Sequence, residues 1–401
     1  MKKVLFSVLA LGVLFTSCES DDSNGGDSGV VAPATYSFQR DEATSVSYGG
    51  QTTRIAMAEE LIDEMVVNTN SEDKLLGMFD HSEGESDFVD AANLGLNASD
   101  KSVKSKIAAS EDFFSANTTD SNEIKEDFED WIGNQVEDVF DNWDQTAVAG
   151  EAGNIQENGG GSVRYVNEKG LEYDQAVAKS LIGALMVDQM LNNYLSTAVL
   201  DAGENRTDND NDVLDGDNNY TTMEHKWDEA FGYLYGADNA TSPALGADSF
   251  LNKYLSRVDS DSDFSGIAEE IYNAFKLGRA AIVAKNYTVR DEQANIIREH
   301  VSKIIAIRAV YYLQAGKTAK ADGDNGAAFH DLSEGYGFVY GLQFTRQPDT
   351  SDSYYTKSEV DAIIEQLMDG NGFWDVSDDT LDTISNEIAS RFGFTVAEAS
   401  N

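Results

Sequence analysis

The chain has 401 residues, of which 41% are hydrophobic and 10% aromatic, so it can bury the core of one or two globular domains. Its formal net charge of -44 at pH 7 and its pI near 4.1 exclude nucleic acids and anionic membrane surfaces as partners, because both would repel it. An acidic surface favours cationic partners and solubility, and it says little about the fold.

The N-terminus has the features of an export signal. Lys2 and Lys3 precede an apolar run, residues 4–15, that is too short to span a bilayer. Cys18 is the only cysteine of the chain, and it follows small residues in a pattern that resembles a lipobox. We therefore expect residues 1–17 to be a lipoprotein signal peptide and Cys18 to be lipidated.

Residues 18–33 are polar and acidic and have little to bury, so we expect them to form a disordered tether. An acidic cluster directly after a lipidated cysteine resembles the signal that sends lipoproteins of some Gram-negative bacteria to the outer face of the outer membrane. The expected location is the outer membrane, with the protein held there by its lipid anchor and exposed at the cell surface.

An N-terminal hairpin and two helical halves are predicted for the rest of the chain. Alternating aromatic and aliphatic residues around a polar turn at 40–42 indicate a short β-hairpin within residues 34–54. From Ile55 the apolar residues repeat at three and four, which is typical of helices. The predicted fold is all-α, with two pseudo-repeat helical bundles (55–240 and 241–401) after the hairpin. Helices are expected near 71–80, 99–115, 120–146, 173–200, 243–258, 263–286, 290–315 and twice within 356–392, and a glycine-rich loop at 150–170.

An acidic loop, residues 201–219, precedes one of the helices. The spacing of Asp208, Asp210 and Asp212 imitates the start of a calcium-binding loop. However, Val213 stands in place of the turn glycine, and Asn219 in place of the bidentate glutamate. A flexible acidic loop is favoured over a calcium site.

A helical motif occurs twice, at residues 225–236 and 330–341. In both copies His, Glu, Gly, an aromatic, an aliphatic, Tyr and Gly fall at the same offsets, in a chain with only 4 His. The histidine, the glutamate and two glycines of each copy project from one face of the helix. These residues are His225, Glu229, Gly232 and Gly236 in the first copy and His330, Glu334, Gly337 and Gly341 in the second.

Glycine inside a helix costs about 1 kcal/mol relative to alanine, so the paired glycines indicate close approach of another backbone or of a ligand. If the two helices pack on each other across an internal pseudo-twofold axis, the His–Glu pairs converge on a pocket suited to iron or another divalent metal. The alternative is a His–Glu hydrogen bond on each helix, with packing glycines that were duplicated along with the fold.

Residues 276–320 carry nine basic and three acidic side chains, which is unusual in so acidic a chain. Pairing with the acidic helices is one explanation, and an anionic ligand site is the other. Arg308 lies in an apolar stretch and is the expected buried member of this group, where it would need a carboxylate partner.

Four segments carry a resemblance to known proteins: residues 50–61, 223–233, 277–282 and 307–313. They resemble an uncharacterised family of bacterial surface lipoproteins, a domain of unknown function. More distantly, the layout resembles the imelysin-like proteins, which are exported, all-helical, built of two related bundles and linked to iron uptake. Their motif is Gly-x-His-x-x-Glu, whereas this chain has His-x-x-x-Glu. The chain has no His-Glu-x-x-His, so zinc-peptidase chemistry is not supported.

The predicted function is binding of a metal, with iron expected, or of haem, as part of iron acquisition at the cell surface. His225, Glu229, His330 and Glu334 are the predicted ligands, and a TonB-dependent transporter is an expected partner. The alternative is a glycan- or nutrient-capturing lipoprotein that serves an outer-membrane transporter. An enzyme is not expected, because no Ser-His-Asp, Cys-His or phosphate-loop signature is present.

Overall fold

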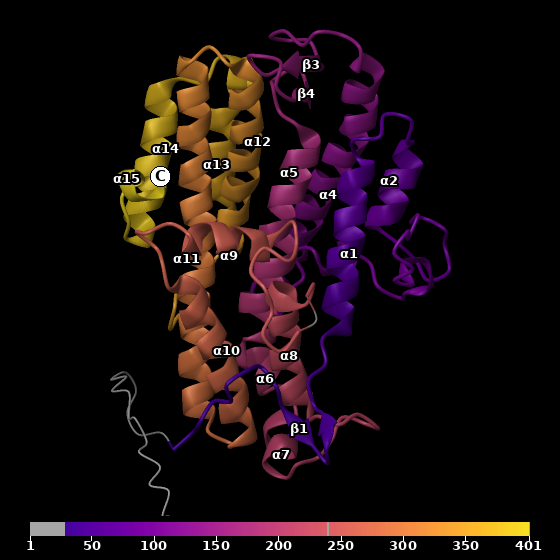
Figure 1. The fold of residues 1–401 in the computed structure, drawn as a ribbon, viewed down its shortest axis with the longest axis vertical. Helices are drawn as coiled ribbons and strands as arrows, with labels where there is room; N and C mark the ends of the chain where they lie inside the picture. The colour runs from indigo at the N-terminus through magenta and orange to yellow at the C-terminus, as the bar shows by residue number, and fades with distance from the viewer. Residues whose placement is uncertain (1–28, 239, 401) are drawn as a thin grey trace, which may run out of the picture.

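The computed structural model describes residues 29–238 and 240–400, so the signal peptide, Cys18 and most of the tether lie outside the described residues. The structure is mostly helical, which confirms the all-α prediction. Figure 1 shows an elongated bundle in which the long helices run along the longest axis. Within residues 29–238 and 240–400, none of the helices has the length and hydrophobicity of a membrane span.

The first part of the chain forms short and medium helices. They are α1 (Gly49–Glu64), α2 (Glu72–Phe79), α3 (Glu111–Phe114), α4 (Thr118–Asn134), α5 (Tyr173–Leu181), α6 (Thr197–Leu200), α7 (Asn205–Asp210) and α8 (Thr222–Tyr235). Between them lie the 3-10 helices η1 (Leu96–Ala98), η2 (Lys104–Lys106) and η4 (Phe140–Asn142) and the π-helices η3 (Gln135–Val139) and η5 (Ile182–Tyr194).

The second part contains the longer helices. They are α9 (Leu251–Asp259), α10 (Ile267–Val283), α11 (Tyr287–Ala321), α12 (Asn325–Gly341), α13 (Lys357–Leu367), α14 (Asp378–Phe392) and α15 (Val396–Ala399), with the 3-10 helices η6 (Leu342–Phe344) and η7 (Gly372–Trp374). Helix α11 has 35 residues and packs against α10, α12 and α14. At 1.5 Å per residue it is about 50 Å long, and it joins the two ends of the bundle.

Two small hairpins complete the fold. The N-terminal hairpin pairs β1 (Gln39–Arg40) with β2 (Ala43–Thr44) and confirms the predicted turn. It is shorter than expected, because α1 begins at Gly49 and already buries Gln51 and Arg54. The second hairpin, β3 (Gly153–Gln156) with β4 (Val163–Val166), lies where only a glycine-rich loop was expected.

A buried ionic network attaches the N-terminal hairpin to α8 and α10. The Arg279 guanidinium is fully buried and binds Glu224 and Asp228 at 3.0 Å each. Arg40 of the hairpin also binds Glu224 at 2.9 Å, and the Tyr36 hydroxyl donates to Asp228 at 2.6 Å. Buried charges need such partners, so the structure fixes one face of α8 against the N-terminal segment.

Helix α12 lies unusually close to η5, the π-helical continuation of α5. A Cβ added at Gly183 of η5 would lie 2.5 Å from the Gly341 Cα atom of α12. That distance is too short for any side chain, so glycine is required where the two backbones meet.

We therefore expect Gly183→Ala to lower the free energy of unfolding by about 2 kcal/mol, because the added methyl group overpacks a backbone contact. Urea denaturation measures this loss. Gly49→Ala is the matched control, since nothing lies within 4 Å of a Cβ at Gly49, and it should change stability by less than about 0.5 kcal/mol. Equal stability of the two variants would contradict the close packing.

Candidate functional site

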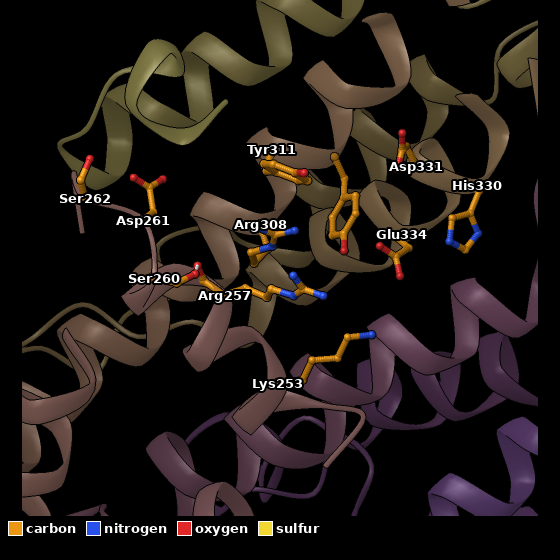
Figure 2. Close-up of a pocket in the computed structure, with 11 residues that line it drawn as sticks. Lys253, Arg257, Ser260, Asp261, Ser262, Arg308, Tyr311, His330, Asp331 and Glu334 are labelled. Atoms are coloured by element: carbon orange, nitrogen blue, oxygen red, sulfur yellow. Dashed lines mark hydrogen bonds between the residues drawn. The ribbon is translucent and has the colours of Figure 1, made fainter. Parts of the chain in front are cut away.

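A pocket of about 680 Å³ lies between α9, α11 and α12 and contains the second copy of the motif (Figure 2). Its volume is in the range of sites for small molecules. Charged and tyrosine side chains make up most of its wall. The lining residues are Lys253, Arg257, Ser260, Asp261, Ser262, Arg308, Tyr311, Tyr312, His330, Asp331 and Glu334.

Glu334 is a buried carboxylate that the surrounding protein keeps ionised. Its Oε1 atom lies 3.1 Å from Lys179 Nζ and accepts a hydrogen bond from the Tyr254 hydroxyl at 3.2 Å. Burial alone would raise the pKa of Glu334, but the positive charges of Lys179 and His330 outweigh burial and lower it to about 2. The negative charge of Glu334 is therefore already balanced within the protein.

The imidazole ring of His330 is held in place by the carboxylate of Glu172. Its Nδ1 atom lies 2.7 Å from the Glu172 carboxylate, to which it donates, so Nε2 is the nitrogen left for another partner. Burial acts to lower the pKa of His330, but the hydrogen bond and charge of Glu172 raise it above its ordinary value. A carboxylate that orients an imidazole in this way is common behind ligand-binding histidines.

Asp331 follows His330 and also lines the pocket. Burial raises the pKa of Asp331 to about 6. Figure 2 shows the Asp331 side chain apart from Arg257 and Arg308. Because the pKa of Asp331 is about 6, its carboxyl group changes charge near pH 6.

The first copy of the motif has a different environment, on α8. His225 Nδ1 donates to the Ser47 carbonyl at 3.0 Å, Nε2 lies 3.9 Å from Glu229, and the ring stacks on Tyr220 at 4.6 Å. Burial lowers the pKa of His225. Both nitrogens of His225 therefore face protein groups, and the histidine helps to hold the N-terminal segment.

The two His–Glu pairs do not meet, which corrects the expectation that the motif helices pack on each other. Helix α8 packs chiefly on η5, α1, α10 and α7, whereas α12 packs on α11 and α5. Figure 1 shows α8 in the lower half of the bundle and α12 in the upper half. Within residues 29–238 and 240–400, no group of three or more His, Cys, Asp and Glu side chains is placed to hold a metal ion.

The glycines of both copies face neighbouring helices instead of each other. A Cβ at Gly232 would lie 2.5 Å from Tyr48 Cβ, and one at Gly337 would lie 2.4 Å from Lys179 Cβ. Gly236 lies against Thr52, and Gly341 lies against Gly183 and Ile305. In each copy the glycine three residues after the glutamate lets another helix approach.

The helix that approaches each motif glycine also carries a side chain that binds the motif glutamate. At the first copy, Gln51 of α1 donates to Glu229 at 3.0 Å, and Lys226 also binds it at 2.8 Å. At the second copy, Lys179 of α5 binds Glu334. The same local arrangement thus recurs at both copies, although the internal duplication of the whole chain stays a prediction.

The acidic segment before α8 is partly helical. Asp208 and Asp210 belong to α7, Asp210 accepts a hydrogen bond from the Tyr287 hydroxyl at 2.6 Å, and Asp212 binds Lys285 at 3.0 Å. A calcium loop would need these carboxylates to turn toward one centre. Here two of the three bind protein groups of the α10–α11 region instead.

Two basic residues of the pocket, Lys253 and Arg257, were not predicted. They stand four residues apart on α9, which places them on one face of that helix. This spacing was the one signal available in the sequence, but nothing in it showed that α9 would lie beside α12. Arg308 was predicted to be buried, and it is only 7% exposed.

The chain matches the family described as Domain of unknown function (DUF4856) over residues 33–395. It belongs to this family. The resemblance predicted from the sequence is thereby confirmed at the level of an uncharacterised family. No curated protein and no solved structure matches the chain. The function of this family member must therefore be argued from the pocket itself.

The substitution Glu172→Gln tests the anchoring of His330. Loss of the carboxylate charge removes the interaction that raises the pKa of His330, so this pKa should fall. Histidine NMR resonances followed against pH measure the change, and His225, which has no contact with Glu172, serves as the internal control. An unchanged His330 pKa would show that Glu172 does not set its protonation.

Proposed function

We propose that this family member captures chelated iron, as haem or a similar iron complex, in the pocket between α9, α11 and α12. The observation that carries the proposal is His330, which lines a cavity of about 680 Å³ while its Nδ1 atom is held by Glu172 at 2.7 Å. A single histidine is a sufficient protein ligand for haem iron. The iron complex is cargo, and the pocket needs to bind and release it.

Chelated iron suits this pocket better than a bare ion. A bare transition metal takes three or four protein ligands in a fixed geometry, and the described residues do not supply such a group. A chelate brings most of its own donor atoms. The protein then has to supply an axial ligand and a pocket that fits the organic part.

Export and membrane attachment belong to the same proposal. A lipid on Cys18 would hold the protein at the outer membrane, and the acidic tether would give the binding domain reach from the surface. A TonB-dependent transporter is the proposed recipient of the cargo. The distant resemblance to imelysin-like proteins, which are linked to iron uptake, supports this role.

A second candidate function is capture of a glycan or another nutrient by the same pocket. Tyr311 and Tyr312 line the pocket, and the Tyr254 ring packs edge-on against Tyr312 at 6.3 Å. Aromatic rings at a polar site suit the faces of sugar rings as well as the edge of a porphyrin. This candidate keeps the same location and the same pocket, but it assigns no ligand role to His330.

Haem titration followed by absorbance distinguishes the two candidates. We expect the wild-type chain to shift the Soret band, and His330→Ala to weaken haem binding by at least about tenfold, because the iron loses its protein ligand. His225→Ala is the matched control on the other motif helix and should bind as the wild type does. If all three proteins bind haem and ferric chelates equally or not at all, iron capture at His330 is wrong.

A further inference from the structure

Three positive side chains converge on one wall of the pocket. Lys253 and Arg257 come from α9 and Arg308 from α11. Figure 2 shows the guanidinium groups of Arg257 and Arg308 next to each other, with the Lys253 ammonium group directed into the same space. Burial, and after it the positive charges nearby, lower the pKa of Lys253.

Arg308 has no counterion in the described part of the protein. The residue is 7% exposed, its Nε–H has no acceptor, and it forms no salt bridge with a described carboxylate. A buried guanidinium without acceptors costs free energy, because it gives up hydration and gains no hydrogen bond. The carboxylate partner that the sequence led us to expect for Arg308 is thus absent among the described residues.

Tyrosine rings stabilise the Arg308 charge only in part. The guanidinium carbon lies 3.9 Å from the ring centre of Tyr311 and 4.6 Å from that of Tyr312. A cation–π contact supplies no hydrogen-bond acceptor to the guanidinium group. Its N–H donors can therefore still bind an acceptor.

The carboxylates around the pocket either bind other groups or lie apart from Arg308 and Arg257. Glu334 binds Lys179 and the Tyr254 hydroxyl. Asp261 accepts a hydrogen bond from the Asp263 backbone at 3.0 Å, and Figure 2 shows it apart from the two arginines, as is Asp331. No acid of the pocket therefore serves Arg308 and Arg257.

We propose that Arg308, Arg257 and Lys253 form a subsite for an oxyanion group, that is a carboxylate, phosphate or sulfate, on the captured ligand. The planar guanidinium groups present paired N–H donors that match two oxygens of such a group, and the lysine adds a point charge. The subsite rests on the proposed function only in placing the ligand in this pocket. It requires no iron.

Isothermal titration of the full chain with citrate, inorganic phosphate and sulfate at low ionic strength tests the subsite. We expect at least one of the three anions to bind, and the tightest of them identifies the oxyanion. Arg308→Gln should weaken that binding by at least about tenfold, because the removed donors are charged and partly shielded from water. Arg257→Gln, at the exposed mouth, should weaken it less and leave folding unchanged.

Arg206→Gln is the matched control. Arg206 also stacks on a tyrosine, at 4.3 Å from the Tyr287 ring centre, but it lies outside the pocket and next to Asp201. Its substitution should leave anion affinity unchanged. The proposal is overturned if none of the three anions binds the wild type, or if the Arg308→Gln and Arg257→Gln variants both bind the anion as tightly as the wild type.

The outcomes for the subsite and for iron capture are separable. Weaker anion binding in Arg308→Gln and Arg257→Gln with no effect of His330→Ala on haem binding would retain the subsite and remove iron as the cargo. Loss of haem binding in His330→Ala with unchanged anion binding in the arginine variants would retain iron capture and remove the subsite.

Discussion

The contact between α12 and α5 determines which charges of the pocket are neutralised within the protein. Gly337 has no side chain, so α5 approaches until Lys179 Cβ would lie 2.4 Å from a Cβ at that position. This approach brings the Lys179 ammonium group to Glu334, where the pair is almost fully buried. Glu334 is then neutralised from the α5 side, and Arg308 on α11 is left without a carboxylate. By permitting the close contact of α5 with α12, Gly337 thus also contributes to the unbalanced positive charge at Arg308.

At the first motif copy a glycine also admits a neighbouring helix, but the side chain that this helix brings to the glutamate is uncharged. Gly232 admits α1, and Gln51 of that helix binds Glu229. A neutral amide takes the place that the Lys179 ammonium group has at the second copy. The N-terminal segment then covers this copy, because Ser47 binds His225 and the Arg279 network holds the hairpin. One copy therefore serves the attachment of the N-terminus, while the other borders the ligand pocket.

Sequence periodicity predicted helices that bury one apolar face, such as α2 and α14. The repeated motif singled out His330 and Glu334, and the basic stretch singled out the buried Arg308; all three line the pocket. The motif glycines were placed against the wrong helices, because a glycine stripe shows that a neighbour is close but not which neighbour it is. Lys253 and Arg257 were missed since their role depends on α9 lying beside α12, a long-range contact. Residues 99–115 were expected to be one helix, yet only the short η2 and the four-residue α3 are helical there.

The most direct test of the positive wall is a crystal structure of the full chain soaked with selenate, whose selenium scatters anomalously. The account predicts an anomalous peak within hydrogen-bonding distance of the guanidinium groups of Arg308 and Arg257. Peaks confined to other surfaces, with the two arginines instead bound to a protein carboxylate, would contradict it.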